Sequence, residues 1–263
     1  WLTLAFRVVF FPIGLFGVAI STVTLPAVAR FHARKDLKSF GETVEEALRL
    51  AFFLTIPATV GLFVLSTDIV RLIFEHGSFT PTDTAETAIA LRAFIIGLIW
   101  YAGIKVLTPC FSALDKPRTP LKVSLVAIAV NVVLNYTAVK LLGMRQVGLA
   151  ASTSVLAIVN FAQFAFYLRK SIGLGSVAAW VRLAWVTAAC SVLCGLASWG
   201  VTYLASPMDR HGAFYGAAAL ILSVACGAAV YLGATYCLRS AESRALLNTV
   251  GSAIQRRLRP QGS

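Results

Sequence analysis

The sequence is poor in charged residues. Only 13% of its 263 residues are charged and 58% are hydrophobic, whereas a typical soluble domain has roughly 25% charged residues. The mean hydropathy of +0.80 agrees with this imbalance. The composition therefore excludes an ordinary soluble enzyme, a disordered tail and a disulfide scaffold, and it favours a chain whose solvent is lipid.

Groups that carry out chemistry are also scarce. The three histidines fall in three different connections, and the 11 carboxylates lie in connections or at the ends of apolar stretches. No HExxH, GxSxG or phosphate-binding loop motif is present. All five cysteines lie inside apolar stretches, which is typical of small buried residues rather than of a metal site. The sequence predicts no enzyme and no organic cofactor.

The chain instead contains long apolar stretches. Seven stretches are long enough to cross a hydrocarbon layer of ~30 Å. They cover residues 3–29, 47–67, 87–114, 120–141, 147–168, 180–205 and 213–238. The sequence therefore predicts an all-α integral membrane protein with seven transmembrane helices. It opens on Trp1 within the first stretch, without the charged segment of a signal peptide, which predicts a piece of a longer chain.

Basic residues are distributed unevenly between the two sides of this predicted bundle. The net charge is +12. One set of alternating connections carries Arg30, Arg34, Lys35, Lys38, Lys116, Arg118, Lys122, Arg169, Lys170, Arg182, Arg239, Arg244, Arg256, Arg257 and Arg259, and the other carries Arg71, Lys140, Arg145 and Arg210. The richer side is predicted to be cytoplasmic, with the C-terminus, and nucleic-acid binding is a poor explanation of the charge. The connection 30–46 is amphipathic and predicts either a short helix on the membrane surface or a solvated linker.

Three cations lie within predicted spans, with no intramembrane acid to pair with them. They are Arg7 in the first span and Arg92 and Lys105 in the third. A buried cation costs at least ~2.5–3.5 kcal/mol at the centre of a bilayer, so such residues usually face a wet cavity or a partner. Arg92 is close enough to the end of its span to extend to the interface. For Arg7 and Lys105 an anionic lipid headgroup is a sensible ligand, because phosphate oxygens match these donors.

Two further patterns concern helix shape and ion binding. Prolines and glycines predict bends at Pro12, Gly14 and Gly17 in the first span and at Pro109 in the third. Asn131 and Asn135 share one face of the fourth span, and Thr153 comes from the next. Their oxygens predict either an ion site, for example for sodium, or ordinary hydrogen bonds between helices.

Three segments resemble one known family. They are PIGLFGVA at 12–19, FEHGSFT at 74–80 and the long run KVLTPCFSALD at 105–115. Together they resemble the MurJ (MviN) lipid II flippases, which belong to the multidrug/oligosaccharidyl-lipid/polysaccharide exporter superfamily. The similarity extends to Lys170, and the last two spans fit by position and hydropathy. Two departures are Phe10, where some relatives carry an acid, and Ser112, where a tyrosine is frequent.

The resemblance implies a fold of fourteen helices, in two six-helix lobes plus a C-terminal pair. Residues 1–170 would belong to the second lobe, 171–238 would form the C-terminal pair, and 239–263 would be a basic cytoplasmic tail. The missing N-terminal half would supply the first lobe. The implied localisation is the bacterial cytoplasmic membrane, with membrane lipids as neighbours.

The implied function is transport of lipid II, an undecaprenyl-pyrophosphate-linked muropeptide, to the outer leaflet by alternating access. Arg7 matches an arginine expected to meet the pyrophosphate. Lys105 is predicted as a second substrate-binding cation from its position within a span alone. Some members are expected to use sodium, and Asn131, Asn135 and Thr153 match that site in part. The competing hypotheses are another exporter of the superfamily, such as a polysaccharide-lipid flippase or a drug/cation antiporter, and a membrane scaffold that transports nothing.

Overall fold

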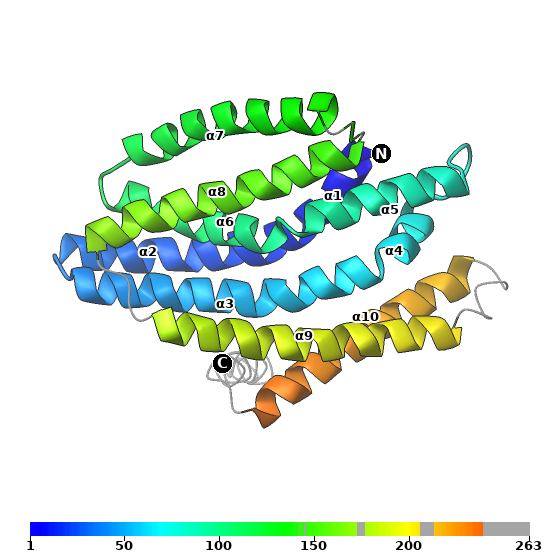
Figure 1. Ribbon diagram of the computed structural model, residues 1–263. Coiled ribbons are helices and arrows are strands. Elements are labelled where there is room, and N and C mark those ends of the chain that lie inside the picture. Colours follow the sequence, from blue (N-terminus) through cyan, green and yellow to red (C-terminus); the bar gives the residue numbers. More distant parts are fainter. Residues whose placement is uncertain (142, 145, 173–176, 206–212, 239–263) are drawn as a thin grey trace, which may run out of the picture.

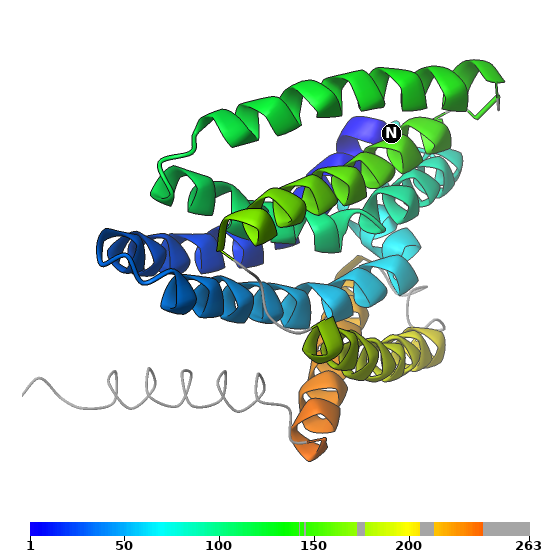
Figure 2. The same cartoon turned by 60° about the vertical axis from the view of Figure 1, so that its left-hand side comes forward.

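The computed structural model describes residues 1–141, 143–144, 146–172, 177–205 and 213–238, and these residues form helices joined by short connections. Figure 1 shows long helices, most of them running in nearly the same direction and α10 obliquely to them, with α7 at one side and α9 and α10 at the opposite side. Figure 2 shows the same order after rotation, with α7 outermost beside α8. The predicted tail, residues 239–263, lies outside the described part.

The first span is one continuous helical segment with an irregular centre. It consists of α1 (Leu2–Pro12), a π-helical turn η1 (Ile13–Val18) and α2 (Ala19–Ala33). Pro12 has no backbone N–H to donate, so the regular i to i−4 pattern is interrupted there. The wider π-helical turn follows directly after it.

The connection predicted at 30–46 is much shorter than expected, and both predictions for it are wrong. Helix α3 (Leu37–Val64) begins ten residues before the predicted span, and Asp36 caps it by accepting a hydrogen bond of 3.0 Å from the Ser39 N–H. The amphipathic pattern has another cause: Phe40 and Val44 are fully buried against neighbouring helices. These residues face protein rather than a membrane surface.

The third predicted span is bent at a position that contains no proline. After the short helix α4 (Ser66–Phe74), helices α5 (Pro81–Ile95) and α6 (Leu98–Ala113) meet at an angle of 47°. This break lies at Gly97, whereas Pro109 lies inside α6. The break at Gly97 is an additional bend that the prolines do not predict, and a hinge at Pro109 stays a prediction.

The remaining helices are α7 (Arg118–Tyr136) with the π-helical turn η2 (Thr137–Leu141), α8 (Gln146–Ile172), α9 (Val177–Ala205) and α10 (Ala213–Cys237). Six helical segments are long and apolar enough to cross a membrane, and the bent pair α5–α6 gives up to seven. The chain is thus an all-α, multi-pass membrane protein, and each of the seven predicted stretches corresponds to one of these segments.

Among the described residues, two large hydrophobic cores stabilise the helices α1 to α8, and a third, smaller cluster joins α3 to α9 and α10. The N-end core lies near the N-terminus and consists of Ala5, Val9, Ile13, Val70, Ala88, Ala90, Leu91, Ala93, Phe94, Ile95, Leu98 and Ala150. The hairpin-end core lies near the α2–α3 turn and consists of Ile20, Val28, Phe40, Val44, Ala47, Leu48, Ala51, Val106, Leu107, Cys110, Phe111, Leu114, Val123, Phe164 and Leu168. Helix α8 contributes to both cores.

The pair α9–α10 attaches to the bundle through α3. The Tyr231 hydroxyl donates a 2.7 Å hydrogen bond to the Phe53 carbonyl, and both residues are buried with Cys190 and Cys194. Gly227 of α10 lies directly against the Ser198 side chain of α9, where a Cβ would not fit. This glycine therefore lets α9 and α10 approach each other closely.

Candidate functional site

Helix α1 has one packed face and one open face. Ala5, Val9 and Ile13 are buried in the N-end core. The exposed residues away from this face, continuing through η1, include a row at helical spacing: Thr3, Arg7, Phe10, Gly14 and Val18. Phe11 and Leu15 are exposed beside this row. We call the row the open stripe. It places a cation and an aromatic ring on the same surface of the first span.

Arg7 is exposed on the open stripe and its charge is unpaired. In the described part of the chain its guanidinium has no hydrogen bond, ion pair or ring contact. Its own span offers no acid, since residues 1–35 contain neither Asp nor Glu. A cation in this position is stabilised either by water or by an anionic ligand. Its planar donor fork suits phosphate oxygens.

The second predicted cation lies on the third predicted span, beside a later part of the first span. Lys105 of α6 is exposed, and its stem packs over Gly17 of η1, where an added Cβ would lie 3.2 Å from the Lys105 Cβ. Gly17 is ten residues, or about 15 Å, from Arg7 along the helix. Arg7 and Lys105 therefore mark two levels of the first span and do not form one cluster.

The glycines predicted as hinges differ in their surroundings. Gly17 is buried against α6, whereas Gly14 is exposed and a Cβ added to it would meet no atom within 4 Å. Both belong to η1, directly after Pro12. Short π-helical segments are frequent at functional sites. Movement at these residues stays a prediction, as it does for Pro109.

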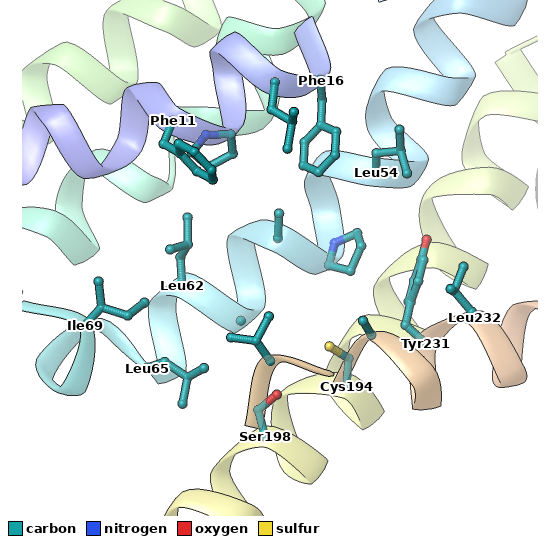
Figure 3. A pocket seen from close by; sticks show the side chains of 17 residues that line it. Phe11, Phe16, Leu54, Leu62, Leu65, Ile69, Cys194, Ser198, Tyr231 and Leu232 are labelled. Atoms are coloured by element: carbon teal, nitrogen blue, oxygen red, sulfur yellow. The ribbon is translucent and has the colours of Figure 1, made fainter. Parts of the chain in front are cut away.

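An apolar cavity of about 430 Å³ opens beside the open stripe (Figure 3). Phe11 and Phe16 reach it from the first span, Leu54 and Leu62 from α3, and Tyr231 from α10. The other lining residues are Pro12, Leu15, Pro57, Ala58, Gly61, Leu65, Ile69, Cys194, Ser198, Val224, Ala228 and Leu232. Almost all these side chains are hydrocarbon, so the cavity suits an apolar chain rather than a polar ligand.

The comparisons with known proteins agree with this arrangement of helices. The family model described as "Lipid II flippase MurJ" matches residues 1–222. The chain belongs to the MurJ family. A solved structure titled "Lipid II flippase MurJ, inward closed conformation" has a TM-score of 0.70 and 26% identity over 90% of this chain and 46% of that chain. A transporter of the multidrug MATE family has a TM-score of 0.57 at 18% identity, which shows the fold alone.

Curated MurJ relatives are considerably longer than this chain. "Probable lipid II flippase MurJ" of Vibrio cholerae is 38% identical over 162 residues, which are 62% of this chain and 30% of that protein. "Lipid II flippase MurJ" of Burkholderia cenocepacia is 31% identical over 240 residues, 89% of this chain and 45% of that protein. This MurJ-family chain thus spans less than half the length of each.

The predicted ion-site residues lie on the two neighbouring helices α7 and α8. The Asn135 amide nitrogen donates a 2.9 Å hydrogen bond to Asn131 Oδ1, and the Thr153 hydroxyl donates a 2.8 Å hydrogen bond to the Leu149 carbonyl. Asn135 Oδ1 is buried and has no partner among the described residues. An oxygen in this state fits a cation or a further donor, although no carboxylate accompanies it here.

Two polar anchors of this MurJ-family chain escaped sequence reasoning. The Ser154 hydroxyl of α8 accepts a 3.1 Å hydrogen bond from the Gly97 N–H and donates a 2.6 Å hydrogen bond to the Ala93 carbonyl. It therefore satisfies backbone groups at the α5–α6 break. Arg92 is the second anchor. Its Nε donates a 2.7 Å hydrogen bond to Ser66 Oγ, and a terminal nitrogen donates a 3.1 Å hydrogen bond to Thr67 Oγ1. A glycine inside an apolar stretch was the available signal for the first.

Proposed function

We propose that this chain is part of a transporter that moves lipid II from the inner to the outer leaflet of the bacterial cytoplasmic membrane by alternating access. The family membership supports the class of transporter. The names of the relatives support the cargo. In this proposal residues 1–170 belong to the second lobe, residues 171–238 are a C-terminal helix pair, and a partner lobe completes the cavity.

One observation carries the proposal, namely the order of groups along the first span. The unpaired cation Arg7 is followed one helical turn later by Phe11, which lines the apolar cavity. Residues four apart in a helix are separated by about 6 Å along its axis. A ligand in which an anion is joined to a long hydrocarbon chain matches this order, because the anion meets Arg7 while the chain enters the cavity. A polyprenyl pyrophosphate has this chemistry.

The competing exporters fit the same surface less well. An antiporter of cationic drugs is expected to present acidic side chains to its substrate. The open stripe carries Arg7 instead, Lys105 is exposed further along, and residues 1–35 have no acid. A polysaccharide-lipid flippase shares the anionic headgroup chemistry, so it is separated from the proposal by the cargo measured.

The proposed orientation places the α2–α3 turn and the C-terminus in the cytoplasm. His32 Nε2 at the end of α2 lies 3.5 Å from Asp115 Oδ2, which follows α6. The Lys116 ammonium donates a 3.1 Å hydrogen bond to the Ser171 hydroxyl of α8. Three connections rich in Lys and Arg therefore meet at one end of the bundle. Such an excess of positive charge is typical of the cytoplasmic side.

Sodium is the ion that we propose as a candidate for Asn131, Asn135 and Thr153. The unpartnered Asn135 oxygen supports an additional ligand at this position. An asparagine pair supplies only neutral oxygens, so a carboxylate from outside the described residues is expected to complete the site. Loss of any sodium dependence of transport in Asn135→Leu tests this assignment.

The test of the function measures lipid II on the outer leaflet of cells depleted of their own flippase. These cells carry the natural protein that contains this sequence, either unchanged or as Arg7→Ala or Arg7→Lys. The unchanged protein should restore exposure, Arg7→Ala should abolish it, and Arg7→Lys should retain part of it because a point charge remains. Restoration by Arg7→Ala at equal expression would contradict the role of Arg7. No restoration by the inserted wild type would contradict the cargo.

A further inference from the structure

Two adjacent phenylalanines of α1 project to different surroundings. Phe11 is 74% exposed in this structure and lines the apolar cavity. Phe10 is 42% exposed and is not part of that lining. Neighbouring residues of a helix are about 100° apart around its axis. Phe10 and Phe11 therefore lie on opposite sides of Arg7, about 60° and about 40° from it around the axis, and Phe11 is on the side of the site proposed for the hydrocarbon chain.

The Phe10 ring packs against another aromatic side chain on one side. Its centroid lies 4.4 Å from the Phe6 ring at an interplanar angle of 57°, and Phe6 in turn lies 5.4 Å from Phe94. Phe94 is buried in the N-end core. The chain of three rings supports Phe10 on one side and leaves part of it open. A large apolar side chain fixed on the same surface as an unpaired cation is unlike an ordinary lipid-facing residue, whose neighbours on the surface are apolar.

We propose that Phe10 is a specificity-determining residue that binds the sugar ring attached to the anionic group. This inference rests on the proposed function. With the anion at Arg7 and the hydrocarbon chain at Phe11, the remaining substituent of the pyrophosphate lies on the open stripe, where Phe10 is the aromatic group. The face of a phenyl ring is electron-rich and attracts the weakly positive C–H groups of a pyranose ring.

The role differs from that of Arg7 in what it distinguishes. Arg7 attracts any polyprenyl pyrophosphate, because it recognises the charge. A stacking surface at Phe10 adds affinity only when a sugar is present, and a contact of this kind is expected to change affinity by roughly three- to tenfold. Phe10 would therefore favour the glycosylated cargo over the sugar-free polyprenyl pyrophosphate that remains after the sugar is used.

The experiment compares two ligands and four proteins. The natural protein that contains this sequence is placed in phosphatidylcholine nanodiscs, and its affinities for lipid II and for undecaprenyl pyrophosphate are measured. The variants are Phe10→Leu, Phe10→Tyr and, as the matched control, Phe11→Leu. Phe10→Leu should weaken lipid II binding roughly three- to tenfold and leave the sugar-free lipid unchanged. Phe10→Tyr, which keeps the ring, should bind both lipids as the wild type does.

Each result has a defined meaning. Phe11→Leu should weaken both lipids equally, because both carry the same chain. If Phe10→Leu weakens both lipids equally or neither, or if Phe10→Tyr loses as much as Phe10→Leu, the proposal for Phe10 is wrong. If the unchanged protein binds neither lipid, the proposed function itself fails, so the two failures are distinguished.

Discussion

The two cores of the bundle are built from different side chains. The N-end core is rich in alanine, with Ala5, Ala88, Ala90 and Ala150 almost completely buried. The hairpin-end core contains large side chains, among them the fully buried Phe40. Small residues let helices approach closely, as is common in membrane interiors. Large residues fill wider gaps by side-chain packing.

The helices also differ in regularity between the two cores. In the first span η1 separates Ile13 of the N-end core from Ile20 of the hairpin-end core. In the third predicted span the break at Gly97 precedes Leu98, the last N-end core residue of that segment. Arg7 and Phe10 of the candidate site lie at the alanine-rich end of the bundle, where both interruptions begin. Small core residues and irregular backbone thus occur together at this end.

Loss of a large side chain from the hairpin-end core should have the largest effect on stability. Phe111 is fully buried, and its ring lies 5.5 Å from that of Phe164. Phe111→Ala should lower the free energy of unfolding by about 3–5 kcal/mol, since it leaves a cavity. Unfolding measured by steric trapping in bicelles checks this. Phe166→Ala, at a 66% exposed position, is the control and should change stability much less.

The N-end core should be sensitive to side chains that are made larger rather than smaller. Ala90 has no exposed surface. Ala90→Leu should destabilise the protein by about 1–3 kcal/mol because the neighbouring helices cannot separate freely. The same unfolding measurement applies. Ala129→Leu on the exposed face of α7 is the matched control. Equal tolerance of the two substitutions would contradict the close packing inferred for this core.

The serine that bridges the α5–α6 break should matter more than its neighbour on α8. Ser154→Ala removes the hydroxyl that accepts from the buried Gly97 N–H and donates to the Ala93 carbonyl, while the Gly97 N–H keeps its 3.0 Å hydrogen bond to the Phe94 carbonyl. The expected cost is therefore that of lost hydrogen bonds, about 0.5–1.5 kcal/mol. Ser152→Ala removes only a 2.8 Å bond to the Gly148 carbonyl of its own helix and should cost less. Faster hydrogen exchange at the Gly97 amide in Ser154→Ala alone is the expected observation. Equal exchange in both variants would mean that Ser154 does not stabilise the break.

A smaller contrast is expected between the two glycines of η1. Alanine in place of an exposed helical glycine is favourable by roughly 0.5–1 kcal/mol. Gly14→Ala should show this gain, because its Cβ would meet no atom within 4 Å. Gly17→Ala should lose it through the close contact with Lys105. Thermal unfolding of both variants measures the difference, and an identical shift would argue against the packing of Lys105 over Gly17.

The smallest expected effect is a dependence on pH at the start of α3. Hydrogen bonds from Ser39 lower the pKa of Asp36 below its ordinary value of 3.8. The charged cap therefore stabilises the helix at neutral pH, and this contribution is lost as the pH falls through the lowered pKa. Thermal unfolding between pH 6 and 3 should show this decline. Asp36→Asn, which caps without titrating, should show a weaker decline at the same pH.

Sequence reasoning predicted the helices well and their interruptions poorly. Apolar length is a local property, so all seven stretches were found, and the proline rule located the irregularity after Pro12. The break at Gly97 depends on the Ser154 hydroxyl, 57 residues away along the chain. A polar group supplied from such a distance leaves no local pattern.

The candidate site was predictable only in its charges. Arg7 and Lys105 stood out because cations are rare in apolar stretches. Their separation along the first span, and the different directions of Phe10 and Phe11, depend on helix packing. The amphipathic segment 30–46 was misread for a related reason: a buried helical face and a membrane-bound face have the same period.

The hydrogen bonds of Arg92 have a consequence for movement in any transport cycle. Its guanidinium joins α5 to the first residues of α4, and it lies 5.8 Å from the Phe63 ring near the end of α3. Separating these elements would strip a charged group of its partners in a medium with little water, which is costly. The end of α3, α4 and α5 should therefore travel together as one rigid corner, and the bending of this lobe is left to η1 and Gly97.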